Sequence, residues 1–275
     1  MIDAPPARRV LLGTALRRYR EQLGYVLEDA ARVLDCDRSK ISRIETGQRG
    51  IRPRELRDLL TEYGVGEREQ GALAAIADAR RRGRWWQAYA EALPEPYLDY
   101  LTLEQAASDI LIYAPQHIPD LLQTPDYAQV SATGPAAATP HKPAALTIAR
   151  QQALLERRPG ITALIGETAL CQLNGGPGVI REQLNVLASP RAQVAVQILP
   201  SGTALPPGGP AIILRFASLP ALGAVYLPGM SGGICLASQH DVASHIAAFE
   251  RLQAAALTPA ASAQLITEMT ERQKN

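Results

Sequence analysis

Residues 27–47 read LEDAARVLDCDRSKISRIETG, and their pattern is the clearest structural signal in the N-terminal part of the chain. Its first apolar residues are spaced three or four apart, as on the buried face of a short helix: Leu27, Ala30, Ala31 and Leu34. A connection at residues 35–37 ends on Asp37, which is placed as the N-cap of a helix over Arg38–Thr46. Two short helices joined by such a turn form a helix-turn-helix unit.

Further helices surround this unit on both sides. The same apolar spacing predicts a helix from Arg8 to Leu23, which Gly24 ends, and Pro53 stands in the first turn of another helix that reaches Tyr63. A fifth helix is expected from about Glu67 to Arg82, and it ends in a basic cluster at residues 80–84. That cluster either contacts DNA or is a solvated helix end. The sequence therefore predicts an all-α head of five helices.

The outer side of the Arg38–Thr46 helix carries residue types that contact DNA. Its exposed positions are expected to be Arg38, Ser39, Lys40, Ser42 and Arg43, with Gln48 and Arg49 just beyond its end. Arginine pairs with guanine edges in the major groove, serine contacts bases or phosphates, and lysine adds positive charge. Such a charge run on an arbitrary helix is usually only a solvated face. The flanking turn and cap favour the DNA-binding interpretation here.

The stretch Leu27–Leu34 followed by KISRIETG at residues 40–47 resembles the Xre and phage-repressor family of helix-turn-helix regulators. Carried over position by position, the resemblance implies that Arg38, Ser39 and Arg43 face base edges. It implies phosphate contacts for a second set: Arg32, Lys40, Ser42, Thr46 and Arg49. Asp35 departs from the family, which often has glycine in the turn, but aspartate tolerates the left-handed conformation.

Charge separates the chain into two parts. Residues 1–84 contain 18 Lys or Arg against 13 Asp or Glu, whereas residues 85–275 contain 10 against 14. A basic head on a weakly acidic body is expected when only the head meets a polyanion such as double-stranded DNA. We therefore predict a DNA-binding domain at 1–84 and a second domain at 85–275.

The composition also limits the location and chemistry of the chain. No apolar run reaches the ~18–20 residues of a membrane span, and residues 1–9 lack the layout of a secretion signal, so a cytoplasmic protein is expected. Cys36, Cys171 and Cys235 lie far apart, and His240 and His245 are not spaced as paired ligands on one helix face. Neither a metal site nor a cofactor is expected.

The second domain is predicted to be α+β with a small sheet. Branched apolar runs bracketed by Gly or Pro predict strands at Ile161–Ile165, Val194–Leu199, Ile212–Phe216, Ala224–Leu227 and Ile234–Ala237. Helical spacing predicts helices at Tyr97–Tyr113, Lys142–Arg157, Val179–Leu187, Asp241–Ala256 and Pro259–Arg272.

Four stretches of this domain resemble the C-terminal domain of unknown function that accompanies Xre heads in antitoxin-like actinobacterial regulators. They are Trp85-Trp86, residues 116–128, Gly175-Gly176-Pro177 and Val225-Tyr226-Leu227. The resemblance implies transcriptional control, often of development or secondary metabolism, and pairing with a small protein encoded nearby. It implies no particular ligand.

A few residues of the second domain are candidates for chemistry. His117 stands where the related sequences generally have an apolar residue; it is either a core histidine or a pocket residue able to act as acid or base. Glu167 is its candidate partner, and Gln116 and Tyr113 are grouped with it. Residues 229–233 read GMSGG and match the nucleophile elbow G-x-S-x-G, but a strand is expected after them, which favours a hairpin loop.

Three functions remain open at this stage. The leading hypothesis is a sequence-specific transcription regulator, a homodimer that reads a pseudo-palindrome and senses a small molecule or binds a partner through its second domain. The alternative is a cofactor-free enzyme of natural-product biosynthesis that dehydrates, adds or cyclises in an apolar pocket; we favour the non-enzymatic hypothesis. The third is a surface for a small protein partner without a ligand cavity.

Overall fold

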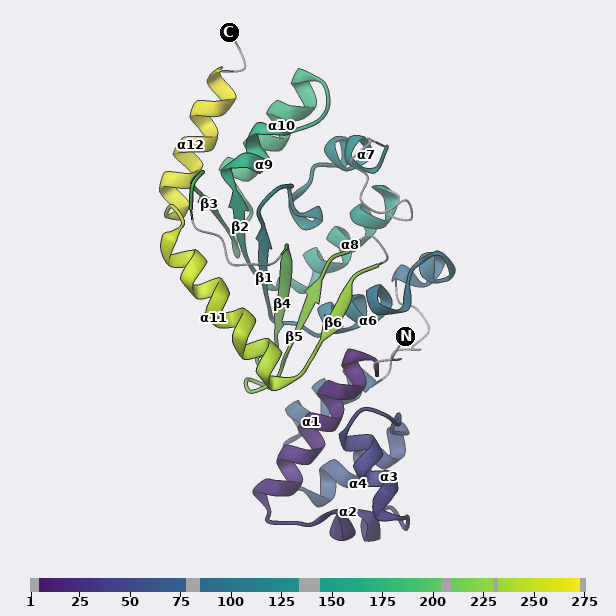
Figure 1. The fold of residues 1–275 in the computed structure, drawn as a ribbon. Coiled ribbons are helices and arrows are strands. Elements are labelled where there is room, and N and C mark those ends of the chain that lie inside the picture. The colour runs from purple at the N-terminus through teal and green to yellow at the C-terminus, as the bar shows by residue number, and fades with distance from the viewer. Residues whose placement is uncertain (1–4, 78–84, 134–143, 204–208, 230–231, 273–275) are drawn as a thin grey trace.

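The computed structural model describes residues 5–77, 85–133, 144–203, 209–229 and 232–272. The basic cluster at residues 80–84 and the end of the fifth predicted helix lie outside these residues. So do Met230 and Ser231 of the GMSGG stretch. Within the described residues the chain forms a helical head and a mixed body of helices and one sheet, so the predicted α+β class is confirmed (Figure 1).

The head contains the five predicted helices with nearly the predicted bounds. They are α1 (Ala7–Gln22), α2 (Leu27–Val33), α3 (Arg38–Glu45), α4 (Pro53–Glu62) and α5 (Glu67–Ala77). Their apolar residues meet in one buried cluster that includes Leu11, Ile41 and Leu59. Gly13 lets α1 cross α3 closely, because a Cβ there would lie 2.4 Å from the carbonyl oxygen of Glu45. Gly47 follows α3 with a φ of +75°, the left-handed conformation that glycine adopts without strain.

The body adds helices on both sides of its sheet. They are α6 (Glu95–Glu104), α7 (Pro125–Thr133), α8 (Ala144–Arg157), α9 (Glu167–Cys171), α10 (Pro177–Ala188), α11 (Gln239–Ala255) and α12 (Pro259–Arg272). Two short 3₁₀ helices, η1 (Trp85–Ala92) and η2 (Asp120–Leu122), lie in the connections. Helices α7 and α9 were not predicted, since both are short and lack a sustained apolar period.

The sheet has six strands in the order β3-β2-β1-β4-β5-β6. The strands are β1 (Asp109–Ala114), β2 (Gly160–Gly166), β3 (Val194–Leu199), β4 (Ala211–Arg215), β5 (Gly223–Leu227) and β6 (Ile234–Leu236). Strands β1, β2 and β3 are parallel, and β4, β5 and β6 continue the sheet in antiparallel pairs. The parallel pairs need crossovers, which α7 with α8 and then α9 with α10 supply.

Strand β1 corrects the sequence prediction, which placed a helix over Tyr97–Tyr113. The helix, α6, ends at Glu104, and residues 109–114 pair with β2 on one side and with β4 on the other. A central strand is buried on both faces and therefore reads as a continuous apolar run rather than as an alternating one. The run from Ile110 to Ile112 extends the apolar spacing of α6, and this made the two elements look like one helix.

Two helical layers cover the sheet (Figure 1). On one face α11 packs Val242 and Phe249 against Tyr113, Leu164 and Val225. The opposite face is covered by α6, α8, α10 and α12, whose apolar side chains join those of Ile110, Ile112, Ala163 and Ile198. Both faces are therefore buried, as the apolar composition of the strands requires.

Head and body are joined through the first turn of α1, which packs against α6. Asp99 of α6 accepts a hydrogen bond from the backbone nitrogen of Arg8 at 3.0 Å, and the guanidinium of Arg8 lies 3.3 Å from the other carboxylate oxygen. Asp99 is buried, so the body provides the N-terminal cap of the first head helix. A second contact links Arg68 of α5 to Ser218 at 3.2 Å.

Candidate functional site

Helix α3 has one buried and one exposed face. Ile41, Ile44 and Glu45 are buried in the head, whereas Arg38, Ser39 and Arg43 are exposed on the other side. Asp37 occupies the N-cap position as predicted, in an extended conformation, although its side chain accepts no capping hydrogen bond. The exposed face is therefore a row of hydrogen-bond donors on a short, well-supported helix.

The turn between α2 and α3 has the predicted geometry. Asp35 has a φ of +46°, which is the left-handed conformation expected for an aspartate at this position. The backbone nitrogen of Cys36 donates to the carbonyl of Ala31 at 3.0 Å and closes the end of α2. This turn sets the angle at which α3 leaves α2.

Glu45 anchors α3 to α1 and was missed by the sequence analysis. The guanidinium of Arg20 donates to both carboxylate oxygens of Glu45, at 2.7 and 2.8 Å, and to the carbonyl of Tyr25 at 2.7 Å. Both side chains are buried, and the hydrogen bonds to Glu45 raise the pKa of Arg20. Glu45 therefore has a structural role in holding α3 in place. The exposed side chains of α3 are the ones that can bind a ligand.

The exposed cations of α2 and α3 make only surface contacts within the head. Arg38 donates to Glu28 at 3.0 Å, and this hydrogen bond lowers the pKa of Glu28. The Nε of Arg43 donates to the backbone carbonyl of Ser39 at 3.2 Å, and Arg32 pairs with Asp29. Since all three arginines are exposed, their guanidinium groups can exchange these partners for phosphate or base edges.

The other predicted DNA-contacting residues differ in how far they are exposed. Lys40 donates to Glu55 of α4 at 2.8 Å, and only 18% of its side chain is exposed. Ser42 is half-buried, and the hydroxyl of Thr46 donates to its backbone carbonyl at 2.9 Å. Arg49, by contrast, is exposed in the loop after α3. Lys40 therefore fastens α3 to α4 in the free protein.

The four candidate residues of the body lie near the carboxyl ends of β1 and β2. A Cβ on Gly166 would lie 2.2 Å from the carbonyl oxygen of Pro115, so the segments that hold His117 and Glu167 are adjacent. Gln116 and His117 are exposed, so the interpretation of His117 as a core histidine is wrong. The carboxylate of Glu167 accepts a hydrogen bond from the backbone nitrogen of Ser201 at 2.7 Å.

Tyr113 is separated from the other three candidates because its side chain is buried on the face that α11 covers. Its hydroxyl is buried and has no hydrogen-bond partner among the described residues, and burial raises the pKa of the phenol. The structure therefore brings the segments of Gln116, His117 and Glu167 together. It places the side chain of Tyr113 in the core between the sheet and α11.

The remaining motifs have structural roles. Strands β5 and β6 pair in antiparallel fashion around residues 228–233, which confirms the hairpin expected instead of a nucleophile elbow.

Within the described ranges, no three side chains of His, Cys, Asp or Glu are grouped so that they could hold a metal ion. His245 contacts the backbone carbonyl of Asp241 at 2.7 Å.

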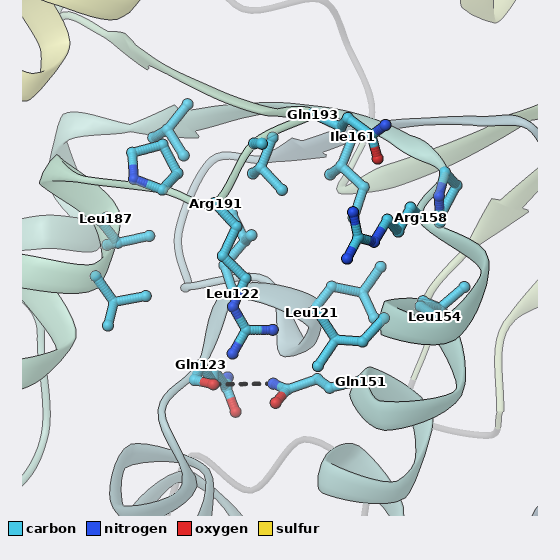
Figure 2. Close-up of a pocket in the computed structure, with 17 residues that line it drawn as sticks. Leu121, Leu122, Gln123, Gln151, Leu154, Arg158, Ile161, Leu187, Arg191 and Gln193 are labelled. Carbon is cyan, nitrogen blue, oxygen red and sulfur yellow. Dashed lines mark hydrogen bonds between the residues drawn. The ribbon is translucent and has the colours of Figure 1, made fainter.

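A cavity of about 430 Å³ lies elsewhere in the body, at the amino ends of β2 and β3 (Figure 2). It is bounded by η2 and by the last turns of α8 and α10. Most of its lining is apolar, and its polar side chains are arginine and glutamine. None of the four candidate residues of the body lines it.

The fold and the exposed face of α3 define a helix-turn-helix protein with an α+β second domain. Comparison with family models agrees: residues 11–73 match a helix-turn-helix domain, and residues 97–268 match the domain of unknown function DUF5753. Because the second match covers more than half of the chain, the protein belongs to the DUF5753 family. The helix-turn-helix match supports a DNA-binding regulator.

Other comparisons gave no relatives. Neither the curated proteins nor the solved structures include a significant match to this chain. Among the described helices, none is both long and apolar enough to cross a membrane.

Proposed function

We propose that the protein is a sequence-specific transcription regulator of the Xre type that places α3 in the major groove of DNA. The observation that carries the proposal is the exposed row of Arg38, Ser39 and Arg43 on the face of α3 opposite Ile41 and Ile44. The recognition helix of helix-turn-helix proteins has this construction: one face packs against the domain core, and the opposite face presents hydrogen-bond donors to the DNA.

We assign direct base contacts to Arg38, Ser39 and Arg43. The ion pair of Arg38 with Glu28 is largely exposed, with 71% and 53% of the two side chains accessible, so it contributes little to the free head. Breaking this ion pair when the head binds DNA therefore costs little free energy. A bidentate pairing of arginine with guanine, by contrast, contributes about 1–3 kcal/mol of discrimination between bases.

Phosphate contacts are assigned to Arg32, Arg49, Ser42 and Thr46, with Lys40 in a weaker role because it is already paired with Glu55. These contacts position the head on the duplex but carry no sequence information. A single small head makes few base contacts, so we propose a homodimer that reads a pseudo-palindromic operator. The body then serves as the sensing or partner-binding domain, and a small protein encoded nearby is one candidate partner.

The experiment that tests this function is fluorescence anisotropy with the DNA upstream of the gene. The full-length protein is titrated against that duplex and against an unrelated duplex across a salt series. We expect preferential binding to the upstream duplex and a steep decrease in affinity with salt. Arg38→Ala and Arg43→Ala should each weaken specific binding by roughly 5- to 150-fold, the equivalent of about 1–3 kcal/mol.

Two further variants make the comparison quantitative. Arg49→Ala should weaken binding to both duplexes and lower the salt slope by about 1, as expected for one lost phosphate contact. Arg17→Ala is the matched control, because Arg17 is an exposed arginine of α1 paired with Glu21, outside α2 and α3. Unchanged specific affinity in both Arg38→Ala and Arg43→Ala would show that α3 does not read bases.

The enzyme alternative depends on the segment around His117. Neither Gln116 nor His117 lines the 430 Å³ cavity, and the polar side chains that do line it bind and orient ligands rather than transfer protons at neutral pH. We therefore assign no reaction to the cavity.

A further inference from the structure

The cavity at the amino ends of β2 and β3 has the construction of a ligand site. Its volume of about 430 Å³ lies in the range of ~300–1,000 Å³ typical of small-molecule pockets. Leu122, Leu154 and Leu187 are buried at its wall, each from a different helix. Its floor is stabilised by Gln151, whose amide nitrogen donates to the carbonyls of Asp120 and Gln123 at 2.6 and 2.9 Å (Figure 2).

Two arginines give the cavity a positive charge. The side chains of Arg158 and Arg191 both extend into the space drawn in Figure 2, one from the end of α8 and the other from the loop after α10. No carboxylate lines the cavity, and neither guanidinium forms an ion pair with the described part of the chain. Neighbouring Arg157, by contrast, donates to the carbonyls of Glu104 and Ala107.

The backbone conformation at the cavity wall is unusual. Arg158 has a φ of +51° and Gln193 a φ of +72°, and Asp35 is the one other non-glycine residue in the described ranges with a positive φ. Arg158 follows the last turn of α8, a position where glycine has the lowest conformational cost. An arginine in this left-handed conformation has a strained backbone, and its side chain faces the cavity. Strained residues of this kind cluster at ligand sites.

The rim of the cavity is apolar and accessible. Leu155 and Val186 are 44% and 41% exposed, and they belong to the small set of large hydrophobic residues that are exposed in the described ranges. Both line the cavity at its opening. A ligand with an apolar body would therefore cover apolar surface that is otherwise in contact with water.

We propose that this cavity binds a small organic anion, specifically a carboxylate with an apolar body. The carboxylate pairs with the guanidinium groups of Arg158 and Arg191, whose planar donors match its geometry. The apolar body lies against the leucines of the wall and the exposed rim. This site is separate from α3, so the proposal is independent of DNA binding.

Isothermal titration of the full-length protein with octanoate tests the site, with octanol as the uncharged ligand of the same chain length. We expect octanoate to bind about tenfold or more tightly than octanol, because a charge-assisted hydrogen bond is lost with the alcohol. The double variant Arg158→Asn with Arg191→Gln should weaken octanoate binding by about tenfold and leave octanol binding unchanged. Asparagine is chosen at position 158 because it tolerates the left-handed conformation.

Arg181→Gln is the matched control, since Arg181 is an exposed arginine of α10 outside the cavity lining. Circular dichroism establishes that each variant is folded. Equal affinity for octanoate and octanol, no binding of either, or octanoate affinity unchanged in the double variant would each overturn the proposal. A second copy of the chain covering the rim would also overturn it; in that case Val186→Asp lowers the sedimentation coefficient and octanoate does not bind.

Discussion

Among the described residues, head and body each contain one buried arginine–glutamate pair, and the two pairs differ in their surroundings. In the head, Arg20 holds Glu45 and so fastens α1 to α3, with 9% and 5% of the side chains exposed. In the body, Arg150 of α8 holds Glu104 of α6 with an Nε to carboxylate distance of 2.8 Å, and both side chains are 2% exposed. The first pair joins two helices of one small core.

The body pair belongs to a larger network. The hydroxyl of Tyr100 donates to Glu104, Arg150 lies 5.1 Å from the centre of the Tyr100 ring, and Arg150 reaches Asp120 of η2 at 3.5 Å. Helix α6 contacts the head through Asp99, which accepts a hydrogen bond from the backbone of Arg8 in α1. Helix α8 and η2 form part of the cavity wall. The head pair therefore supports the single recognition helix α3, whereas the body pair connects the cavity wall to α6, the helix that contacts the head.

The largest effect is expected from Arg150→Met, which leaves the carboxylate of Glu104 buried without its cation. Breaking a fully buried pair in this way destabilises a protein by about 3–5 kcal/mol. Urea unfolding followed by tryptophan fluorescence measures the change, because the only two tryptophans, Trp85 and Trp86, lie in η1 against α8.

The double variant Arg150→Met with Glu104→Leu is the control for this prediction. It removes both charges and should recover much of the stability, since apolar replacement of a buried pair is often neutral. A double variant as unstable as Arg150→Met alone would mean that packing around Tyr100, rather than the unpaired charge, explains the loss.

A smaller effect is expected from Glu45→Gln in the head. Glutamine keeps one acceptor for Arg20 but loses the charge, which costs about 2 kcal/mol for a charged hydrogen bond. The midpoint of the helical circular dichroism signal should fall and DNA affinity should decrease, while tryptophan fluorescence still reports a native body. Glu21→Gln serves as the control, because Glu21 is exposed and its surface contacts with Arg17 and Arg20 contribute little. Equal loss of both signals would show that head and body unfold as one unit.

The smallest effect is expected at the joint between the two parts. Asp99→Ala removes the cap of α1 and should cost about 1 kcal/mol, whereas Asp99→Asn keeps an acceptor for the backbone nitrogen of Arg8. Thermal unfolding of the two variants at neutral pH separates the lost cap from the lost charge. Equal destabilisation by Ala and Asn would contradict the capping role.

The pH dependence of Asp99 has a definite sign. Burial raises its pKa from the ordinary value of 3.8, and the hydrogen bond and charge of Arg8 oppose this only in part. The folded state therefore binds the proton more tightly than the unfolded state, so stability from this group decreases as the pH rises from 3.8 through the folded pKa. Asp99→Asn lacks this dependence, and its stability relative to the natural protein should increase over that range. A pH-independent difference would show that the carboxylate is not destabilised by burial.

The sequence predicted the head better than the body because the helix-turn-helix pattern is local. The apolar spacing, the N-cap residue and the turn all lie within residues 27–47, so each can be recognised from residues that are close together in the sequence. Strand β1 was missed because its pairing partners, β2 and β4, lie far along the chain and its apolar run continues the pattern of α6. A buried central strand leaves no alternating signal.

The exposed residues of α3 were predictable, but the features that depend on tertiary contacts were not. Arg20 and Glu45 are 25 residues apart, and Arg150 and Glu104 are 46 apart, so nothing in the sequence pairs them. The cavity is lined from η2, α8, β2, α10 and β3, and its two arginines are ordinary surface residues in the sequence. His117 drew attention because it is an unusual residue type at its position, yet it lies outside that lining.

The capping of α1 by Asp99 has a consequence for the DNA as well as for the protein. In the homodimer that we propose, each recognition helix is carried by α1, and α1 is held by a buried carboxylate of the body. Each base pair inserted between two half-sites turns one of them by about 34–36° around the duplex axis. A head held in this way does not follow that rotation, so the spacing between half-sites becomes part of the sequence that the protein recognises.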